Sequence, residues 1–352
     1  MPALNHKKRL CVLRQAMRKA SLDSFLVTSA TNVSYLSGFR GTDAVVLITP
    51  DKGYFLTDSR YIEEAKKEIS GNLNVRLVKE SIFTSVNDIV TSQKLKNLGF
   101  ESMDLPYGVA NRLKILLSKI EFTPVKNLVE SLRSIKDAGE IERIRKAVKL
   151  AKEVFERAAG SVRPGASEEF IKRKIELDLV SKGSSCAFES IIASGENSSK
   201  PHARATDRPF KNNDFVMIDM GAKVDGYNSD LTRTVVLGKV QAKFRKIYKT
   251  VGQAQLKAIA RITSGAKASD IDKAGRDHIK KSGFGKYFSH SLGHGVGMSV
   301  HEEPSISPSS KTILAEGMIF TVEPAIYIPG FGGVRIEDMV LVTKSGCEIL
   351  TR

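Results

Sequence analysis

Residues Phe215-Val216-Met217-Ile218-Asp219 form an apolar segment that ends in a carboxylate. Asp225-Gly226 follows, and this dipeptide is typical of a two-residue β-hairpin turn. With these two residues as the turn, Asp219 lies opposite Thr232, and Asp230 is a diagonal neighbour on the same face, about 7–8 Å away at Cα. Two such carboxylates repel each other, so both are not ionised without a cation between them. The hairpin therefore predicts a divalent metal ion.

Three further residues of the ligand type follow. Gly293-His294-Gly295 presents an imidazole in a glycine-rich segment, where the backbone can approach closely. Glu323 and Glu337 each lie in an apolar run that predicts a buried strand, where an acidic group is costly unless it is paired or binds a metal. Taken singly, each has a structural explanation, because Glu337, for example, can pair with Arg335. Together with the two aspartates of the hairpin they predict one metal site.

The charges of these ligands favour two metal ions over one. Four carboxylates carry four negative charges and a neutral imidazole adds none, so two divalent cations leave a bridging hydroxide as the only surplus charge. With ions about 3.5–4 Å apart, such a pair lowers the pKa of a bridging water and polarises a carbonyl oxygen. An oxygen-rich ligand set favours Mn²⁺ or Co²⁺, with Zn²⁺ and Fe²⁺ as alternatives.

Histidines are concentrated near the same segments. The chain has six, and besides His294 three of them, His202, His290 and His301, fall in this part of the sequence. A lone histidine is more often packed or exposed than catalytic, but this concentration favours a site. We expect these imidazoles to bind a developing oxyanion and to orient a peptide.

The composition excludes several classes of protein. The chain has 352 residues, enough for two domains, and its 41% hydrophobic and 27% charged residues are typical of soluble globular proteins. No apolar run approaches the roughly 20 residues of a membrane-spanning helix. Three distant cysteines without a CxxC pair argue against a cysteine-built metal site and favour a reducing compartment. We therefore expect a cytoplasmic protein that does not act at a membrane.

The net charge of +16 admits two interpretations, an anionic partner or a lysine-rich solvated surface. Basic residues are spread along the chain and no nucleic-acid-binding motif is visible, so we expect no nucleic-acid partner. The basic N-terminus superficially resembles a transit peptide. However, Leu10, Leu13 and Met17 have helical spacing and lead into an apolar run, which predicts the first helix of the fold.

The N-terminal part alternates strand and helix patterns, which predicts an α/β domain. Strands are expected at 24–28, 44–48, 53–56, 75–78 and 97–100, and helices at 60–68 and 82–92. No glycine-rich phosphate-binding loop follows any of these strands.

The C-terminal part begins near residue 129. Asp137 and Glu140 predict a capping box at the start of a long helix that ends at Gly160, and Ser167 can cap the next helix. Strands are expected at 215–219, 233–237, 318–328 and 334–342, and helices at 242–262 and 270–281. This separation of strand and helix blocks predicts an α+β domain with an antiparallel sheet.

Seven segments, in this order, resemble those of the creatinase/prolidase/aminopeptidase superfamily of metallopeptidases, which has the pita-bread fold. They are residues 194–198, 201–202, 219–221, 229–234, 290–297, 323–324 and 334–338. Residues 32–39 and 58–61 resemble the creatinase-like N-terminal domain, and residues 132–136 with 140–141 resemble the entry into the catalytic domain. The resemblance implies a creatinase-like domain at 1–128 and a pita-bread catalytic domain at 129–352.

The resemblance also implies a role for each candidate ligand. Asp219 would bind one ion, while Asp230 and Glu337 would bridge the two. His294 and Glu323 would complete the shell of the other ion, and Glu323 would also transfer a proton. The bridging hydroxide would attack the scissile carbonyl.

The remaining candidates are implied to face the substrate. His202, His290 and His301 would line its site, with His301 placed to stabilise the tetrahedral intermediate. Arg335 would support the carboxylates or contact the substrate. One departure from the family pattern is Ala325, where glycine is usual after Glu-Pro; we expect ordinary backbone there and unchanged ligation.

The N-terminal domain argues against a methionine aminopeptidase, and the intact ligands argue against the creatine-hydrolysing branch. Enzymes that cleave the bond before proline remain. A dipeptidase must hold a free carboxylate, commonly with an arginine shortly after the His-Glu-x-Pro segment, but here residues 301–304 are followed by Ser305. We therefore expect an Xaa-Pro aminopeptidase, with an Xaa-Pro dipeptidase as the alternative, because a basic residue from elsewhere can serve.

Two further implications concern partners. Some pita-bread proteins are non-catalytic binding proteins, but these generally lose metal ligands, and this chain has all five. Family members are often homodimers, so we expect a homodimer that takes proline-containing peptides as substrates.

Overall fold

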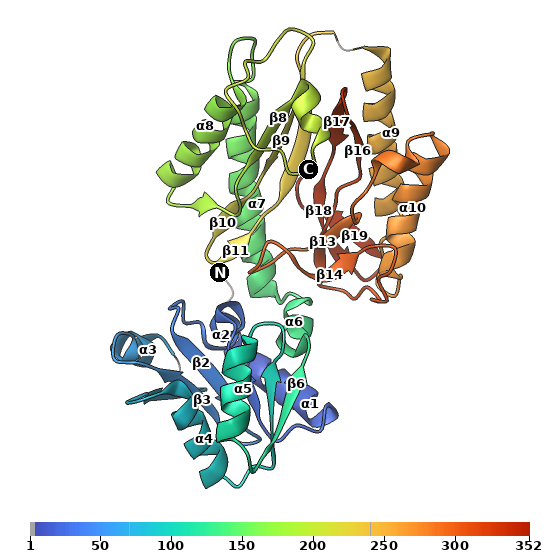
Figure 1. Ribbon diagram of the computed structural model, residues 1–352. Coiled ribbons are helices and arrows are strands. Elements are labelled where there is room, and N and C mark those ends of the chain that lie inside the picture. Colours follow the sequence, from blue (N-terminus) through green and yellow to red (C-terminus); the bar gives the residue numbers. More distant parts are fainter. Residues whose placement is uncertain (1–3, 70, 240) are drawn as a thin grey trace. The chain divides into compact units, whose positions relative to one another are not determined.

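The computed structural model describes residues 4–69, 71–239 and 241–352 (Figure 1). The chain forms two compact units, and the boundary between them along the sequence falls between Arg133 and Ser134. The N-terminal unit ends with α6 (Leu128–Arg133), whereas the sequence boundary was expected after residue 128. The expected pair of an α/β unit and an α+β unit with antiparallel sheets is confirmed. In the described part of the chain, no helix is both long and apolar enough to cross a membrane.

The N-terminal unit is built on one six-stranded mixed sheet in the order β4-β3-β2-β1-β5-β6. Its strands are β1 (Phe25–Val27), β2 (Ala44–Ile48), β3 (Gly53–Thr57), β4 (Asn74–Leu77), β5 (Asn97–Glu101) and β6 (Glu121–Val125). All five expected strands are present. The sixth, β6, contains Pro124 and lies at the sheet edge, where a residue without an N–H is tolerated.

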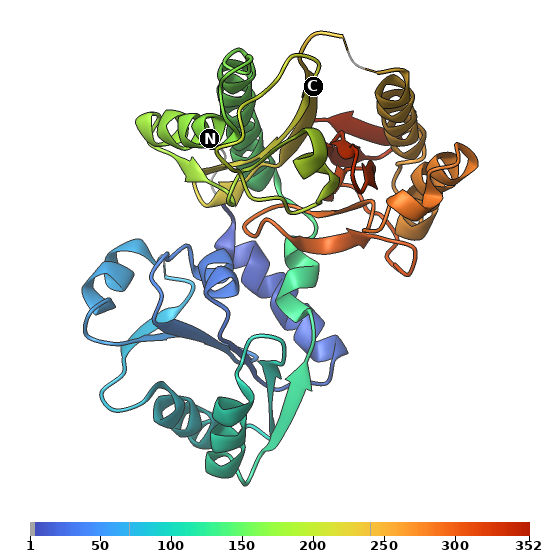
Figure 2. The same cartoon turned by 45° about the horizontal axis from the view of Figure 1, so that its top comes forward.

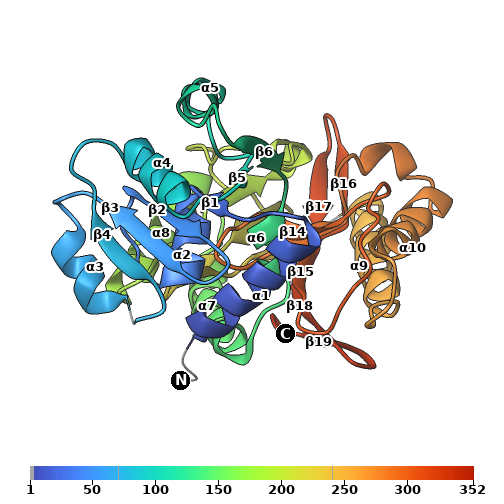
Figure 3. The same cartoon turned by 90° about the horizontal axis from the view of Figure 1, so that it is seen from below.

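Helices cover both faces of this sheet. Figure 3 shows α4 and α5 on one side and α1, α2 and α6 on the other. The helices are α1 (His6–Lys19), α2 (Ala30–Ser37), α3 (Ile62–Glu68), α4 (Ile82–Ser92) and α5 (Tyr107–Leu116). The first helix is confirmed, because Leu10, Leu13 and Met17 are buried on one of its faces.

The first half of the C-terminal unit packs α7 (Ala138–Ala159) and α8 (Glu168–Ser181) against short antiparallel sheets. The capping box of Asp137 and Glu140 and the Ser167 cap are confirmed. The strands are β7 (Ser185–Cys186), β8 (Ile191–Ser194), β9 (Phe215–Met220), β10 (Ala222–Val224), β11 (Tyr227–Asn228) and β12 (Leu231–Val236). The expected hairpin is present: Asp219 pairs with Thr232, and Asp225 and Gly226 form the turn with φ of 52° and 85°.

The second half packs α9 (Ala242–Ile259) and α10 (Ala268–Lys281) against a five-stranded antiparallel sheet and a two-stranded one. Their strands are β13 (Gly293–Gly295), β14 (Glu302–Ile306), β15 (Ile319–Val322), β16 (Ala325–Ile328), β17 (Gly332–Arg335), β18 (Asp338–Thr343) and β19 (Gly346–Ile349). The expectation of continuous strands at 318–328 and 334–342 is wrong. Each is interrupted, at Glu323-Pro324 and at Ile336-Glu337, and the chain passes from one sheet to the other.

The two halves repeat one local plan. Gly165 donates to Phe210 O at 3.0 Å before α8, and Gly265 donates to Leu314 O at 2.8 Å before α10. Both glycines have a φ of 89°, in the left-handed region that glycine favours, and both helices contain 14 residues. The pair α7–α8 and the pair α9–α10 flank the strands from opposite sides (Figures 1 and 2).

Candidate active site

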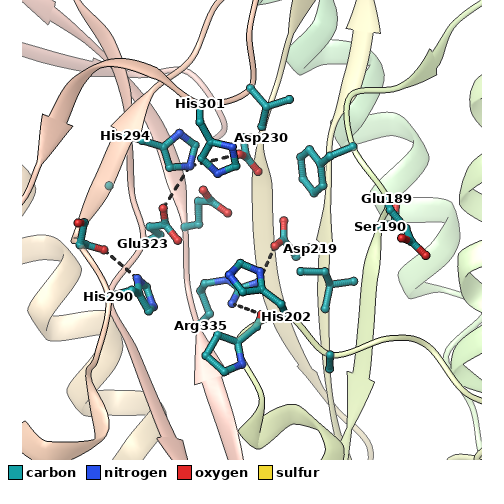
Figure 4. A pocket seen from close by; sticks show the side chains of 18 of the residues that line it. Glu189, Ser190, His202, Asp219, Asp230, His290, His294, His301, Glu323 and Arg335 are labelled. Carbon is teal, nitrogen blue, oxygen red and sulfur yellow. Dashed lines mark hydrogen bonds and ion pairs between the residues drawn. The ribbon is translucent and has the colours of Figure 1, made fainter. Parts of the chain in front are cut away.

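A cavity of about 660 Å³ in the C-terminal unit contains all nine residues that the sequence predicted for the site (Figure 4). It is lined by these nine, Asp219, Asp230, His294, Glu323, Glu337, His202, His290, His301 and Arg335. Further walls come from the segments 188–191 and 201–204 and from Ser305. The structure therefore brings the predicted residues together, whereas their chemical roles remain predictions.

Both halves of the unit contribute acidic groups. Asp219 lies on β9, and Asp230 directly precedes β12. Glu323 follows β15 and Glu337 precedes β18, so each lies where a strand is interrupted. At such an interruption the side chain is freed from the alternation of the sheet, and both carboxylates reach the same cavity.

The acidic groups and His294 are close enough to share a cation. Ligand atoms of Asp230, His294 and Glu337 all lie within 4.8 Å of one another. His294 Nε2 lies 3.3 Å from Glu323 Oε1 and 3.7 Å from Asp230 Oδ2. Asp219 Oδ1 is buried and, among the described residues, has no hydrogen-bond donor. An orphaned carboxylate oxygen beside this donor set fits a divalent metal ion.

The electrostatics of the cluster point the same way. Burial and the charge of Glu337 raise the pKa of Asp230 well above its usual value. Burial, Glu323 and Asp219 raise the pKa of Glu337 to about 8. Burial lowers the pKa of His294, but its hydrogen bond to Glu323 and that residue's charge outweigh this and raise the pKa to about 9. Without a cation, protons must therefore offset the repulsion, and a metal would displace them.

Arg335 pairs with Asp219, so the suggested pair with Glu337 is wrong. Arg335 Nη2 lies 2.5 Å from Asp219 Oδ2, and Nε donates to Thr232 Oγ1 at 3.2 Å. The Glu337 carboxylate instead accepts a hydrogen bond from Thr232 Oγ1 at 2.5 Å. Arg335 is only 4% exposed, although it lines the cavity. Its guanidinium donates to Asp219, Thr232, Tyr327 and Pro201 O, so it holds the Asp219 carboxylate in place.

Tyr327, which the sequence analysis missed, is a buried neighbour of two site residues. Its hydroxyl accepts a hydrogen bond from Arg335 Nη1 at 2.5 Å and lies 3.3 Å from His290 Nε2. In the sequence it was one apolar residue of an expected core strand. The register of β16 and β17, in which Ala325 pairs with Arg335, places Tyr327 on the same face as Ala325 two positions along. Only the pairing of β16 with β17 shows that Tyr327 lies near Arg335, and this pairing is not visible in the sequence.

The three further histidines surround the carboxylates (Figure 4). The His301 ring lies 4.1 Å from the His294 ring, centroid to centroid, and burial together with that neighbour lowers the pKa of His301. Burial also lowers the pKa of His290, whose Nδ1 lies 2.8 Å from Ser291 O. His202 is exposed and lines the cavity. The Nδ1–H of a neutral His290 donates to the Ser291 carbonyl, so its Nε2 is an acceptor. A neutral His301 can donate one hydrogen bond to a bound peptide.

The backbone at Ala325 is ordinary, as expected from the sequence. Ala325 is buried in β16, where it pairs with Arg335 in extended conformation. The neighbouring Glu323 keeps its hydrogen bond to the backbone, in which its N–H donates to Leu292 O at 2.8 Å. The side chain of Glu323 still reaches His294, so the alanine leaves this part of the ligand cluster in place.

Comparison with known proteins assigns both units. Residues 142–344 match Metallopeptidase family M24, and residues 9–135 match the Creatinase/Prolidase N-terminal domain. The chain belongs to metallopeptidase family M24. The resemblance drawn from the seven segments is thereby confirmed, and so is a metal-dependent hydrolase as the class of enzyme.

Some relatives of this M24 peptidase are named Xaa-Pro dipeptidases and others X-Pro aminopeptidases. An Xaa-Pro dipeptidase of Pyrococcus horikoshii is 38% identical over 356 residues, covering 100% of this chain and 98% of that protein. The solved Xaa-Pro dipeptidase of Bacillus anthracis superposes with a TM-score of 0.95 at 38% identity, over 99% and 98% of the two chains. The X-Pro aminopeptidase of Thermotoga maritima superposes with a TM-score of 0.87 at 33% identity, over 96% and 97%.

Proposed function

We propose that this M24 peptidase hydrolyses the peptide bond between an N-terminal residue and proline, using two divalent cations, preferably Mn²⁺. The observation that carries the proposal is the convergence of four carboxylates and one imidazole in a single cavity whose walls hold three more histidines. The ligands would be Asp219, Asp230, His294, Glu323 and Glu337. When bound, the cations supply a Lewis acid for the carbonyl and lower the pKa of water.

The chain's own residues have definable tasks in this proposal. Arg335 holds Asp219 and Thr232 holds Glu337, so both carboxylates are oriented before a ligand arrives. Glu323, hydrogen-bonded to His294, is the carboxylate placed to accept a proton and deliver it to the departing proline nitrogen. His301 and His202 line the cavity and can donate to the carbonyl oxygen of the scissile bond.

Two substrate lengths are compatible with this chemistry. Ser305 lies in the cavity wall where the family resemblance associates an arginine with dipeptidases, which favours an aminopeptidase acting on longer peptides. The dipeptidase names of the Pyrococcus horikoshii and Bacillus anthracis proteins favour dipeptides instead. A homodimer in the cytoplasm, without nucleic acid, remains a prediction from the sequence.

Hydrolysis of a matched pair, Ala-Pro and Ala-Pro-Ala, tests the proposal. We expect alanine release with Mn²⁺, its loss after chelation and its return on adding the metal back. Release from the tripeptide with little from the dipeptide supports the aminopeptidase, and the reverse supports the dipeptidase. Absence of release from both, in folded protein with bound metal, would overturn the proposed function.

A further inference from the structure

We infer that Arg204 binds the free C-terminal carboxylate of the substrate, so that this M24 peptidase prefers short peptides with a free acid end. The inference rests on the proposed function, because it names the group that recognises the far end of the same substrate. A side chain that performs this task must be cationic, must reach the cavity and must have donors to spare.

The described residues lining the cavity include two arginines and no lysine. Arg335 is excluded from this task because it is buried and its guanidinium already donates to Asp219, Tyr327, Thr232 and Pro201 O. Arg204 is exposed, and its guanidinium makes no hydrogen bond or ion pair with any described residue. It is therefore the cation of this wall that is available to a ligand.

Hydrogen bonds to neighbouring segments fix the backbone around Arg204. The carbonyl of Arg204 accepts a hydrogen bond from Asn197 Nδ2 at 3.3 Å. Two residues further on, Thr206 donates from N and Oγ1 to the fully buried Glu168, at 3.0 and 2.8 Å. Fixing the backbone while leaving the side chain free lowers the entropy lost when the guanidinium takes up a carboxylate.

Arg204 shares a stretch of cavity wall with His202. All four residues 201–204 line the cavity, and His202 and Arg204 are the two exposed residues among them. The imidazole and the guanidinium are therefore both accessible to one ligand in this cavity. In the proposed binding mode the scissile carbonyl lies near His202 and the carboxylates, and the part of the peptide that follows proline reaches Arg204.

The neighbouring acidic group does not neutralise this arginine. Glu189, in the same wall, lies 2.6 Å from Lys172 Nζ, and its pKa is lowered mainly by that lysine, with only a minor effect of Arg204. Lys172, Glu189 and Arg204 together leave one positive charge at this end of the cavity. A planar guanidinium with two free edges can bind a carboxylate through two parallel hydrogen bonds.

This assignment is compatible with Ser305. The position after Pro304 offers a hydroxyl and no charge to the cavity. A cation for the substrate carboxylate must then come from another segment, and Arg204 supplies one from the loop that carries His202.

The test compares Ala-Pro with its C-terminal amide, Ala-Pro-NH₂, in Mn²⁺-loaded wild type and in the Arg204→Met variant. We expect wild type to prefer the free acid, with the variant raising KM for the acid about ten- to hundredfold and leaving the amide nearly unchanged. Arg204→Lys should restore part of the preference, because it keeps the charge and loses the planar fork. Lys200→Met is the matched control: it removes a charge from the same loop at an exposed residue outside the cavity wall.

Three outcomes would overturn the inference. They are a wild-type enzyme that cleaves acid and amide equally, an Arg204→Met variant that loses both substrates in parallel, and a Lys200→Met variant that matches Arg204→Met. Each of these leaves metal-dependent cleavage of Ala-Pro intact in wild type, so the proposed function survives them. Absence of cleavage by wild type overturns the proposed function and the inference with it.

Discussion

Arg335 and Asp219 form a buried ion pair across two segments that are more than a hundred residues apart in the chain, with Nη2 and Oδ2 separated by 2.5 Å. The pair links β17 to β9, and so joins the second half of the C-terminal unit to the first. A charge this deeply buried is tolerated because it is paired and because its remaining donors also have acceptors.

Removal of this guanidinium should destabilise the unit. Arg335→Met leaves Asp219 without its counter-charge, and we expect the metal-free protein to lose about 3–5 kcal/mol of unfolding free energy. Scanning calorimetry of the chelated protein measures the loss. The stability of Arg335→Lys should lie between those of wild type and Arg335→Met. An unchanged melting temperature in Arg335→Met would show that Asp219 does not depend on this pair.

Neutralising one carboxylate should have the opposite effect on stability. Asp230 is buried and repelled by Glu337, so Asp230→Asn should stabilise the chelated protein by about 1–3 kcal/mol at neutral pH or above. The same variant should no longer gain stability from Mn²⁺ and should lose peptide hydrolysis. Asp225→Asn, an exposed turn residue, is the control and should change none of these. A metal-free Asp230→Asn protein less stable than wild type contradicts the argument.

Glu168 should control the order of the loop that carries His202. The buried carboxylate of Glu168 accepts five hydrogen bonds, two from Ser194, one from Asn197 and two from Thr206. Glu168→Gln turns one acceptor oxygen into a donor and so leaves at least one buried donor without a partner. This should cost about 1–3 kcal/mol of unfolding free energy. We expect faster amide exchange across residues 195–206 and a higher KM.

The half-buried neighbour Glu169, which pairs with Arg173 on the surface, provides the matched control. Glu169→Gln should leave both the exchange rates and KM at their wild-type values, since a surface ion pair of this kind contributes little to stability. Equal effects of the two substitutions would remove Glu168 from this role.

A pH effect is expected in the N-terminal unit at Glu101. Its carboxylate accepts from Thr28 N and Ser29 N, both at 2.7 Å, and from Asn32 Nδ2 at 2.6 Å. Burial nevertheless raises its pKa to about 7, with Glu130 adding to the shift. The folded unit thus binds this proton more tightly than the unfolded chain does, and stability falls as pH rises from the ordinary carboxyl pKa to about 7.

Amide exchange of residues 25–37 can measure this effect. Between about pH 5 and about pH 8 we expect wild type to lose roughly 1–3 kcal/mol of local stability relative to Glu101→Gln, whose side chain does not titrate. Exchange rates are corrected at each pH with the unfolded chain. A difference between the two proteins that stays constant with pH would mean that Glu101 remains ionised throughout.

Local patterns made much of the fold predictable. The hairpin around Asp225 and Gly226 could be placed because a two-residue turn fixes the register of both strands, and with it the positions of Asp219 and Asp230. The capping box of Asp137 and Glu140 likewise depends on neighbours in the chain. Eight of the nine site residues lie in the seven segments with a family resemblance, and the ninth, His301, begins the His-Glu-x-Pro segment at 301–304.

Features that depend on distant segments were not predictable in this way. Glu323 and Glu337 were expected inside continuous strands, because hydropathy does not show that the chain changes sheets there. A pair of Arg335 with Glu337, two positions away, was one explanation that the sequence offered for Glu337, whereas Arg335 pairs with Asp219 on another strand. Nothing in the sequence singles out Tyr327 or Arg204 as a functional residue. Tyr327 resembles any aromatic residue of a core strand, and Arg204 resembles the many other exposed cations of the chain.

The matching turns at Gly165 and Gly265 divide the C-terminal unit into two copies of one plan, and neither copy contains a complete set of ligands. Asp219 and Asp230 come from the first copy, while His294, Glu323 and Glu337 come from the second. A polypeptide cut between β12 and α9 would therefore yield two fragments that are each inactive. Hydrolysis could return only when the fragments reassociate, so such a split chain would report on its own reassembly.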